Sequence, residues 1–166
     1  SSRLFKEGDR KAIAIDPSYI SKSGKHTHGI GRFWSGCAQQ VKHGLEILGI
    51  GLIDIDRKDC VSLKAVQTPS PKSLVECGVT LVKWYLKCIL NLRDKLIRQS
   101  RYVVADAYFS VSEVANGLEE FGFHLVSRFR SDAAMMYLYT GGRTGKKGRP
   151  KEYDGKIDFK NLDMEK

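Results

Sequence analysis

Three short apolar segments in the first half of the chain predict β-strands. Residues 11–16 (KAIAID) place four apolar residues in a row before an acid, which is typical of a strand covered on both faces. Residues 45–54 (LEILGIGLID) form a second such segment, and residues 61–65 alternate apolar and polar side chains, like a strand with one wetter face. Because the links between the segments are short or irregular, we expect an antiparallel meander, with Pro17 ending its first strand.

The second half of the chain alternates helix-like and strand-like segments. An S-x-x-E capping box at Ser73 begins a predicted helix that runs to about residue 99, a length of roughly 40 Å. Residues 101–106 (RYVVAD) again predict a doubly buried strand that ends in an acid. A helix over residues 110–121, which starts with a second S-x-x-E box, leads to a last strand at 124–128. This alternation requires parallel strands with right-handed crossovers, so the predicted class is α/β with a mixed sheet.

Composition adds an expected division of the chain and an expected partner. We predict a folded core over residues 1–133, and then a basic, Gly-rich region over 134–166 that begins an insertion or forms a linker. The formal net charge of +9 and the isoelectric point near 9.4 favour a polyanionic partner, such as nucleic acid or an anionic membrane surface. No apolar run approaches the roughly 20 residues that would span a bilayer, so we expect no membrane insertion.

The four cysteines indicate neither a zinc site nor a disulfide framework. None of them forms a C-x-x-C pair, which is the spacing most typical of structural zinc ligands. We expect all four to be buried free thiols in a reducing compartment.

Two acids stand in matching positions and are the main candidates for chemistry. Asp16 and Asp106 each follow about five largely apolar strand residues. If the two strands are parallel neighbours, both carboxylates emerge at the same edge of the sheet. Two such carboxylates repel unless a cation lies between them, and Mg²⁺ prefers carboxylate oxygens as ligands. The alternative is that each acid only caps a turn or a helix.

The order and spacing of several stretches resemble the DDE transposases of bacterial insertion sequences. They are residues 13–40 (from IAIDPSYISK to GCAQQ), 44–56 (GLEILGIGLIDID), 103–110 (VVADAYFS) and 124–158 (from HLVSRFRSD to YDGKID). The resemblance implies a ribonuclease-H-like catalytic domain, with three antiparallel strands followed by parallel strands joined by helices. It assigns the first catalytic acid to Asp16 and the second to Asp106.

The same resemblance implies the reaction and the partners. Members of this family use two Mg²⁺ or Mn²⁺ ions to cleave DNA at a transposon end and to join the freed 3′-hydroxyl to target DNA. We therefore expect double-stranded DNA, both transposon ends and target, as the partner, and a homodimer in the full-length protein. The expected location is the bacterial cytoplasm, with the protein on the nucleoid when it is bound to DNA.

The family's third acid, usually a Glu on a helix beyond the fifth strand, has no match in this sequence. We therefore expect the chain to be a transposase fragment that enters a β-rich insertion near its end, and to be inactive on its own. Two alternatives remain open: a non-catalytic DNA-binding remnant of a transposase, and another ribonuclease-H-like nuclease. A continuing reading frame with a Glu on an amphipathic helix would favour the enzyme.

Basic residues in loops and in the tail are the candidates for contacts with DNA phosphates. The predicted set is Lys22, Lys25, Arg32, Arg128, Arg130, Arg143, Lys146, Lys147 and Arg149.

Other polar and aromatic residues have less specific interpretations. His26 and His28 form an H-x-H pair, but two histidines without a third ligand are weak support for a metal site. We expect the adjacent pair Phe33 and Trp34 to pack in the core, although base stacking is an alternative. Asp54 and Asp56 are both predicted to form a turn.

Overall fold

The computed structural model describes residues 8–24, 26–130, 132–142 and 148–163. The chain divides into two compact units, Ser1–Arg128 and Phe129–Lys166. The first unit holds an α/β sheet with its helices, and the second holds a small two-stranded sheet. The functional division predicted at residue 133, into catalytic core and insertion, remains a prediction.

Four strands of the first unit pair in antiparallel fashion. Strand β3 (Gln40–Asp54) pairs along one edge with β1 (Lys11–Ser21). Along its other edge it pairs first with β2 (Gly31–Ser35) and then with β4 (Asp59–Gln67). The predicted meander is therefore confirmed as β1, β3 and β4, and β2 is an additional short strand in what was expected to be an irregular loop.

Two parallel strands complete the sheet on the far side of β1. Strand β5 (Tyr102–Val104) pairs with β1, and β6 (His124–Val126) pairs with β5, both in parallel. The resulting order is β2-β3-β1-β5-β6, with β4 also on β3. This confirms the predicted α/β class with a mixed, ribonuclease-H-like sheet, in which antiparallel strands precede parallel ones.

Strand β1 is longer than predicted, because Pro17 does not end it. Pro17 pairs in register with Leu48, and β1 continues to Ser21. Proline has no N–H to donate, and it is tolerated where one edge of a strand is unpaired. Strand β5 pairs with β1 only at Ile13 and Ala14, so this edge of β1 no longer pairs with β5 by the time the chain reaches Pro17.

The predicted helix of roughly 40 Å is wrong, because three short helices occupy its place. They are α1 (Pro71–Glu76), α2 (Leu81–Leu90) and α3 (Arg93–Leu96). Gly78 adopts a φ of 65°, a left-handed conformation that favours glycine and ends α1. Thr80 then caps α2 by accepting a hydrogen bond from the backbone N–H of Lys83 at 3.2 Å.

The two predicted capping boxes are also wrong. Helix α1 is capped by Ser70, whose Oγ accepts from the backbone N–H of Ser73 at 3.2 Å. Helix α4 (Ser112–Glu119) has no side-chain cap, since Ser110 Oγ instead donates to the carbonyl of Ala107 at 2.8 Å. The serine that caps α1 is therefore Ser70 and not Ser73, and Ser110 does not cap α4.

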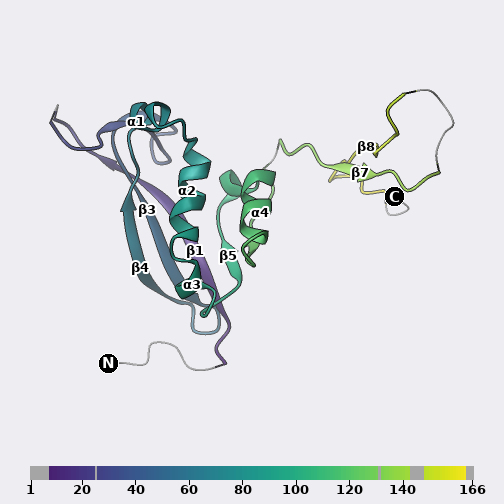
Figure 1. Cartoon of the computed structure of the whole chain (residues 1–166), viewed down its shortest axis with the longest axis horizontal. Helices are drawn as coiled ribbons and strands as arrows, with labels where there is room; N and C mark the ends of the chain where they lie inside the picture. Colours follow the sequence, from purple (N-terminus) through teal and green to yellow (C-terminus); the bar gives the residue numbers. More distant parts are fainter. Residues whose placement is uncertain (1–7, 25, 131, 143–147, 164–166) are drawn as a thin grey trace. The chain divides into compact units, whose positions relative to one another are not determined.

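The core of the first unit lies between one face of the sheet and the helices. Figure 1 shows α2 and α4 lying over this face. Ile13 and Ile15 of β1 point toward the helices and are at most 4% exposed, whereas Asp16, Ser18 and Ile20 are exposed. Buried side chains that contact one another in this core include Leu48, Ile50, Leu52, Tyr85, Ile89, Leu96, Val103, Phe109, Val114, Leu118 and Phe123.

The second unit is small and has little buried surface. Its strands β7 (Met136–Leu138) and β8 (Tyr153–Lys156) form an antiparallel pair. The rings of Phe129 and Phe159 stack with centroids 6.3 Å apart, yet more than half of each side chain is exposed.

The prediction of buried thiols is wrong for three of the four cysteines. All four are free, but Cys37, Cys60 and Cys77 are exposed, and Cys88 is half-buried. Burial raises the pKa of the Cys88 thiol. Within the described part of the chain, no helix is long and apolar enough to cross a membrane.

Candidate active site

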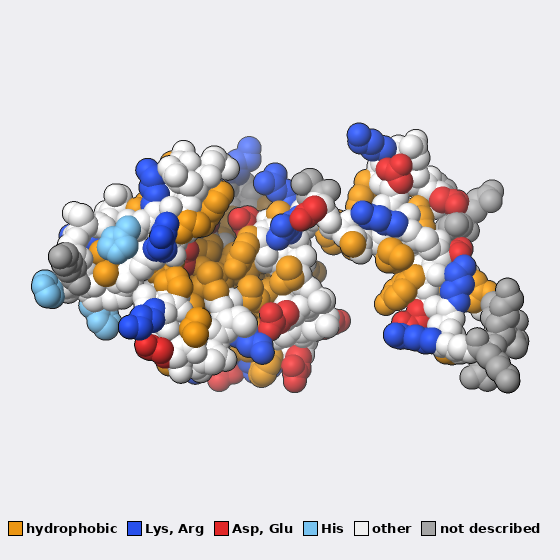
Figure 2. All heavy atoms as spheres, turned by 90° about the horizontal axis from the view of Figure 1, so that it is seen from above, with side chains coloured by type: hydrophobic (Ala, Val, Ile, Leu, Met, Phe, Trp, Pro, Cys, Tyr) orange, Lys and Arg blue, Asp and Glu red, His pale blue; other side chains and the backbone are white. Residues whose placement is uncertain are grey.

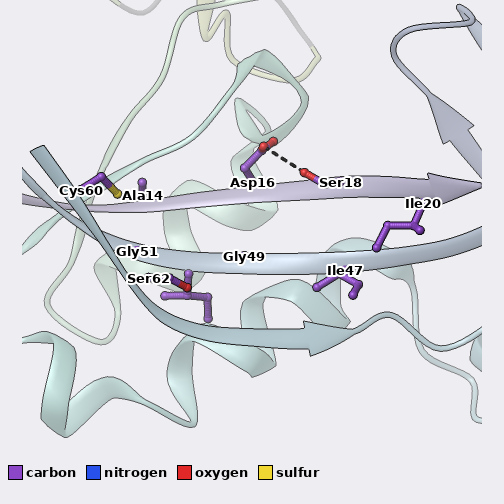
Figure 3. Close-up of a pocket in the computed structure, with 10 residues that line it drawn as sticks. Ala14, Asp16, Ser18, Ile20, Ile47, Gly49, Gly51, Cys60 and Ser62 are labelled. Carbon is purple, nitrogen blue, oxygen red and sulfur yellow. Dashed lines mark hydrogen bonds between the residues drawn. The ribbon is translucent and has the colours of Figure 1, made fainter.

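Asp16 projects from the middle of β1 on the face that the helices leave uncovered. Its neighbours Ile15 and Pro17 point the other way, because successive side chains of a strand alternate between the two faces. Ser18 lies on the same face as Asp16, and its Oγ donates to Asp16 Oδ2 at 3.3 Å (Figure 3). The carboxylate is therefore exposed and has a hydroxyl beside it.

Asp106 lies two residues beyond the last residue of β5 and caps the 3-10 helix η1 (Ala107–Phe109). Its Oδ1 accepts from the backbone N–H of Tyr108 at 3.0 Å, which is the capping role that its sequence context also allowed. Its carbonyl accepts from Ser127 Oγ at 2.7 Å, at the end of β6. These two bonds fix the backbone and one carboxylate oxygen of Asp106.

The strands that lead to the two acids, β1 and β5, are parallel neighbours in the sheet. Ile13 pairs with Val103 and Ala14 with Val104. Asp16 comes two residues after Ala14, and Asp106 comes two residues after Val104, so both acids follow the last paired positions by the same number of residues. The predicted adjacency of the two parallel strands is confirmed, whereas the catalytic and metal-binding roles of the acids remain predictions.

A pocket of about 520 Å³ lies along the uncovered face, with Asp16 in its lining. Small residues floor it, since Gly49 is the cross-strand partner of Asp16 and Gly51 that of Ala14 (Figure 3). A Cβ at Gly51 would lie 3.0 Å from Cys60 Sγ, which is closer than an ordinary contact. Any larger residue at position 51 would crowd Cys60 and fill part of the pocket.

The two acids fit a hard divalent cation in chemistry but supply few ligands. Carboxylate oxygens are preferred by Mg²⁺ and Mn²⁺, and both acids are accessible to solvent. Over the described ranges, no three His, Cys, Asp or Glu side chains are grouped closely enough to hold a metal ion. The site as described thus offers two protein ligands at most.

A buried polar pair, missed at the sequence level, supports the segment after Asp106. The hydroxyl of Tyr85 on α2 donates to Glu46 Oε1 on β3, and the two residues are 2% and 6% exposed. Burial, and secondarily Glu46, raises the pKa of Tyr85 far above its usual range. The Tyr85 ring also packs at 5.5 Å from Phe109 and 6.5 Å from Tyr108, both in η1. The signal in the sequence was Glu46 itself, a lone acid in an otherwise apolar strand.

The predicted DNA-binding residues are scattered and differ in their partners. Lys22, Arg32 and Arg128 are exposed in the first unit. In the second unit, Arg130 contacts Asp132 at 2.9 Å and lowers the pKa of that carboxyl, while Arg149 contacts Glu152 at 2.8 Å. Four of the predicted residues lie outside the described part of the chain: Lys25, Arg143, Lys146 and Lys147. Figure 2 shows histidine side chains close to Lys or Arg side chains on the face in view.

The two neighbours Phe33 and Trp34 have opposite environments. Phe33 is 4% exposed, which confirms the prediction that it packs in the core. Trp34 is 56% exposed, so the same prediction is wrong for it. The cause is the alternation of β2, which turns one side chain toward α1 and the next toward the uncovered face of the sheet.

Asp54 forms a turn, as predicted. It is fully buried, and its Oδ1 accepts from the backbone N–H groups of Asp56 and Arg57, both at 3.0 Å. Asp56 instead pairs with Arg10 at 2.6 Å, which lowers the pKa of the Asp56 carboxyl.

The mixed sheet, with antiparallel strands followed by parallel ones, is ribonuclease-H-like, and sequence comparison gives the family of the chain. The profile of the DDE superfamily endonucleases matches residues 2–164. The chain therefore belongs to the DDE superfamily endonuclease family, whose nucleases generally depend on divalent metal ions. No curated protein matches the chain significantly.

Among solved structures, the chain is similar to an endonuclease V from Ciona intestinalis. That protein is a D234N variant in complex with a 23mer DNA containing an inosine followed by a ribo-adenosine. The identity is 12% and the TM-score 0.40, with 77% of this chain and 48% of the endonuclease chain covered. The chain thus spans about half the length of that protein.

Proposed function

We propose that this chain carries the first two metal-binding acids of a DNA transposase. The observation that supports this most strongly is the parallel pairing of β1, which carries Asp16, with β5, the strand that leads to Asp106. The assignment to a family of DDE endonucleases is consistent with it. In this proposal the protein cleaves DNA at transposon ends and joins the freed 3′-hydroxyl to target DNA.

Asp16 and Asp106 would hold the divalent ions, Mg²⁺ or Mn²⁺. When bound, such ions activate a nucleophile and stabilise the leaving oxygen of a phosphodiester. The chain's own residues position these acids: Ser18 contacts the Asp16 carboxylate, and the Tyr108 N–H orients that of Asp106. The uncovered face beside them leaves room for a DNA backbone.

The partners follow from the same proposal. Double-stranded DNA would contact the exposed basic residues of the first unit and the basic tail, mainly through its phosphates. A homodimer of the full-length protein, acting in the bacterial cytoplasm on the nucleoid, would bring two transposon ends together.

The test of this proposal is the effect of divalent ions on DNA affinity. Without metal, two carboxylates repel a phosphate, and with metal they attract it through the ion. We expect Mn²⁺, at constant ionic strength, to tighten binding of a labelled DNA duplex to the wild-type chain, measured by fluorescence anisotropy. The double variant Asp16→Asn/Asp106→Asn should bind DNA more tightly than wild type in chelator, and should not respond to Mn²⁺.

The control is Asp94→Asn, which removes one exposed acid of α3 whose ion-pair partner is the adjacent Arg93 at 3.2 Å. This variant should respond to Mn²⁺ like wild type. An equal Mn²⁺ response in the double variant would show that the ions act elsewhere. A second assay separates a transposase from other nucleases. It uses a longer chain that includes the family's third acid, and it measures the joining of a DNA end with a free 3′-hydroxyl to a plasmid.

A second candidate function is that of a DNA-binding remnant without catalysis. It is favoured by the lack of a three-ligand metal group over the described ranges. The two candidates differ in the experiment above, because a remnant would bind DNA by charge alone, with no Mn²⁺-dependent gain in affinity.

A further inference from the structure

An exposed tryptophan lies on the same sheet face as Asp16, at the other end of β3. Trp34 of β2 is the cross-strand partner of Val41, and Arg32 is that of His43. We call these four exposed side chains, Arg32, Trp34, Val41 and His43, the hairpin face. Tryptophan is usually well buried, so a Trp that is 56% exposed on a regular strand calls for an explanation.

The strand register connects the hairpin face to the acid. Side chains of directly opposed residues project from the same face of a sheet. Val41 and Gly49 are both odd-numbered residues of β3, so the hairpin face and Asp16, the partner of Gly49, lie on one side. The eight steps along β3 from Val41 to Gly49 span about 26 Å at roughly 3.3 Å per residue. This is the rise of about eight nucleotides in a duplex.

The chain around the hairpin face is basic and has no acid. Residues 17–45 contain no Asp or Glu, but four Lys or Arg and three His. This segment is therefore complementary to a polyanion. The Lys and Arg side chains of a protein partner would find no acid here with which to form an ion pair. The charge favours a nucleic acid as the occupant of the hairpin face.

Hydrogen bonds hold the hairpin in place behind these side chains. The hydroxyl of Tyr19 donates to the carbonyl of His43 at 2.7 Å, and Gln67 Nε2 donates to the carbonyl of His28 at 2.7 Å. Phe33 anchors β2 on the opposite face, where it is buried. The indole is thus presented on a strand that is ordered in advance, which lowers the entropic cost of binding.

From these observations we propose that Trp34 stacks on an unpaired DNA base, with Arg32 contacting the adjacent phosphate. This inference rests on DNA being the partner of the chain, as proposed above. An aromatic side chain flanked by basic residues is the usual platform for single-stranded DNA, and each stack strengthens binding substantially. In this proposal the stacked base lies about 26 Å along β3 from the level of Asp16. Trp34 therefore binds DNA and takes no part in the cleavage chemistry.

The test uses the fact that the chain has two tryptophans, Trp34 and the partly buried Trp84. In the Trp84→Phe variant, Trp34 is the sole indole and reports directly on its own environment. We expect a 20-residue oligothymidine to quench its fluorescence, and a blunt duplex of the same length to quench it much less. Unchanged emission while the oligothymidine is bound would overturn the proposal.

Two substitutions at Trp34 separate stacking from apolar contact. Trp34→Leu should weaken oligothymidine binding about 10-fold, and blunt-duplex binding by less than about twofold. Trp34→Phe keeps an aromatic face and should stay within about threefold of wild type for both. Equal binding of oligothymidine by Trp34→Leu and wild type would contradict the inference, since removal of the aromatic face would then cost nothing.

Two further outcomes are distinguishable in the same experiments. If the wild-type chain binds neither DNA, the proposed function fails. If it binds DNA normally but Trp34→Leu changes only its sedimentation, the hairpin face is a contact between copies of the chain, and the stacking proposal is wrong.

Discussion

The substitution Tyr85→Phe tests the buried pair that supports the segment after Asp106. It removes one oxygen atom and keeps the ring, so the contacts of the ring with Tyr108 and Phe109 are preserved. The Glu46 carboxyl, 6% exposed, loses the donor that satisfies it. Leaving a buried acceptor without its donor costs about 1–3 kcal/mol, so we expect the free energy of unfolding to fall by about 2 kcal/mol. The melting temperature should drop by roughly 4–8 °C for a domain of this size.

The pH dependence of this loss follows from the raised pKa of Tyr85. In the unfolded chain Tyr85 ionises near pH 10, whereas in the folded chain it stays protonated. Its contribution to stability is therefore complete below that pH and is lost as the pH rises further. Above pH 10 the wild-type chain should lose about 1.4 kcal/mol per pH unit relative to Tyr85→Phe, which has no phenol to ionise.

Urea unfolding followed by circular dichroism, near pH 8 and again near pH 11, measures both effects. The matched control is Tyr102→Phe, which removes the same atom from a side chain that is 55% exposed, and should cost less than about 0.5 kcal/mol. Equal losses for the two variants, or a difference between Tyr85→Phe and wild type that does not shrink above pH 10, would refute the reasoning.

Three further predictions concern DNA. Binding of a duplex should weaken by about 10³-fold or more between roughly 50 and 200 mM salt if about six phosphates are contacted, and affinity that is independent of salt would contradict this. Replacing Arg143, Lys146, Lys147 and Arg149 together by Ala should weaken binding of all sequences alike, and a loss confined to one sequence would argue against phosphate contacts. The chain alone should not nick supercoiled plasmid in Mg²⁺ or Mn²⁺ beyond an Asp16→Ala control, because two carboxylates hold two ions poorly, and a misplacement of about 1 Å can cost on the order of 10²-fold in rate. Nicking that only the wild-type chain performs would mean that another acid completes the site.

The strands that lead to the two acids could be predicted because they depend on burial alone. A strand covered on both faces must be apolar throughout, so the segments before Asp16 and Asp106 were recognisable without knowledge of their partners. Their parallel pairing followed from the alternation of strand and helix in the second half of the chain.

The helix breaks and the buried polar pair could not be predicted in the same way. The apolar spacing continues through Gly78, so the periodicity did not show that this residue turns left-handed and ends α1. Tyr85 and Glu46 are 39 residues apart, and their contact exists only once α2 packs on β3. The exposure of Trp34 likewise depends on which face of the sheet the helices cover, and this is a tertiary property.

The most direct test of the account is the location of bound Mn²⁺ on the chain. Mn²⁺ is paramagnetic and broadens the NMR signals of nearby amides, so it can be located without any catalysis. We predict that substoichiometric Mn²⁺ first broadens the amides beside Asp16 and Asp106 together, and that Asp16→Asn/Asp106→Asn abolishes this effect while Asp94→Asn does not. Broadening around only one of the two acids, or the same broadening in the double variant, would contradict the claim that these acids form one metal site.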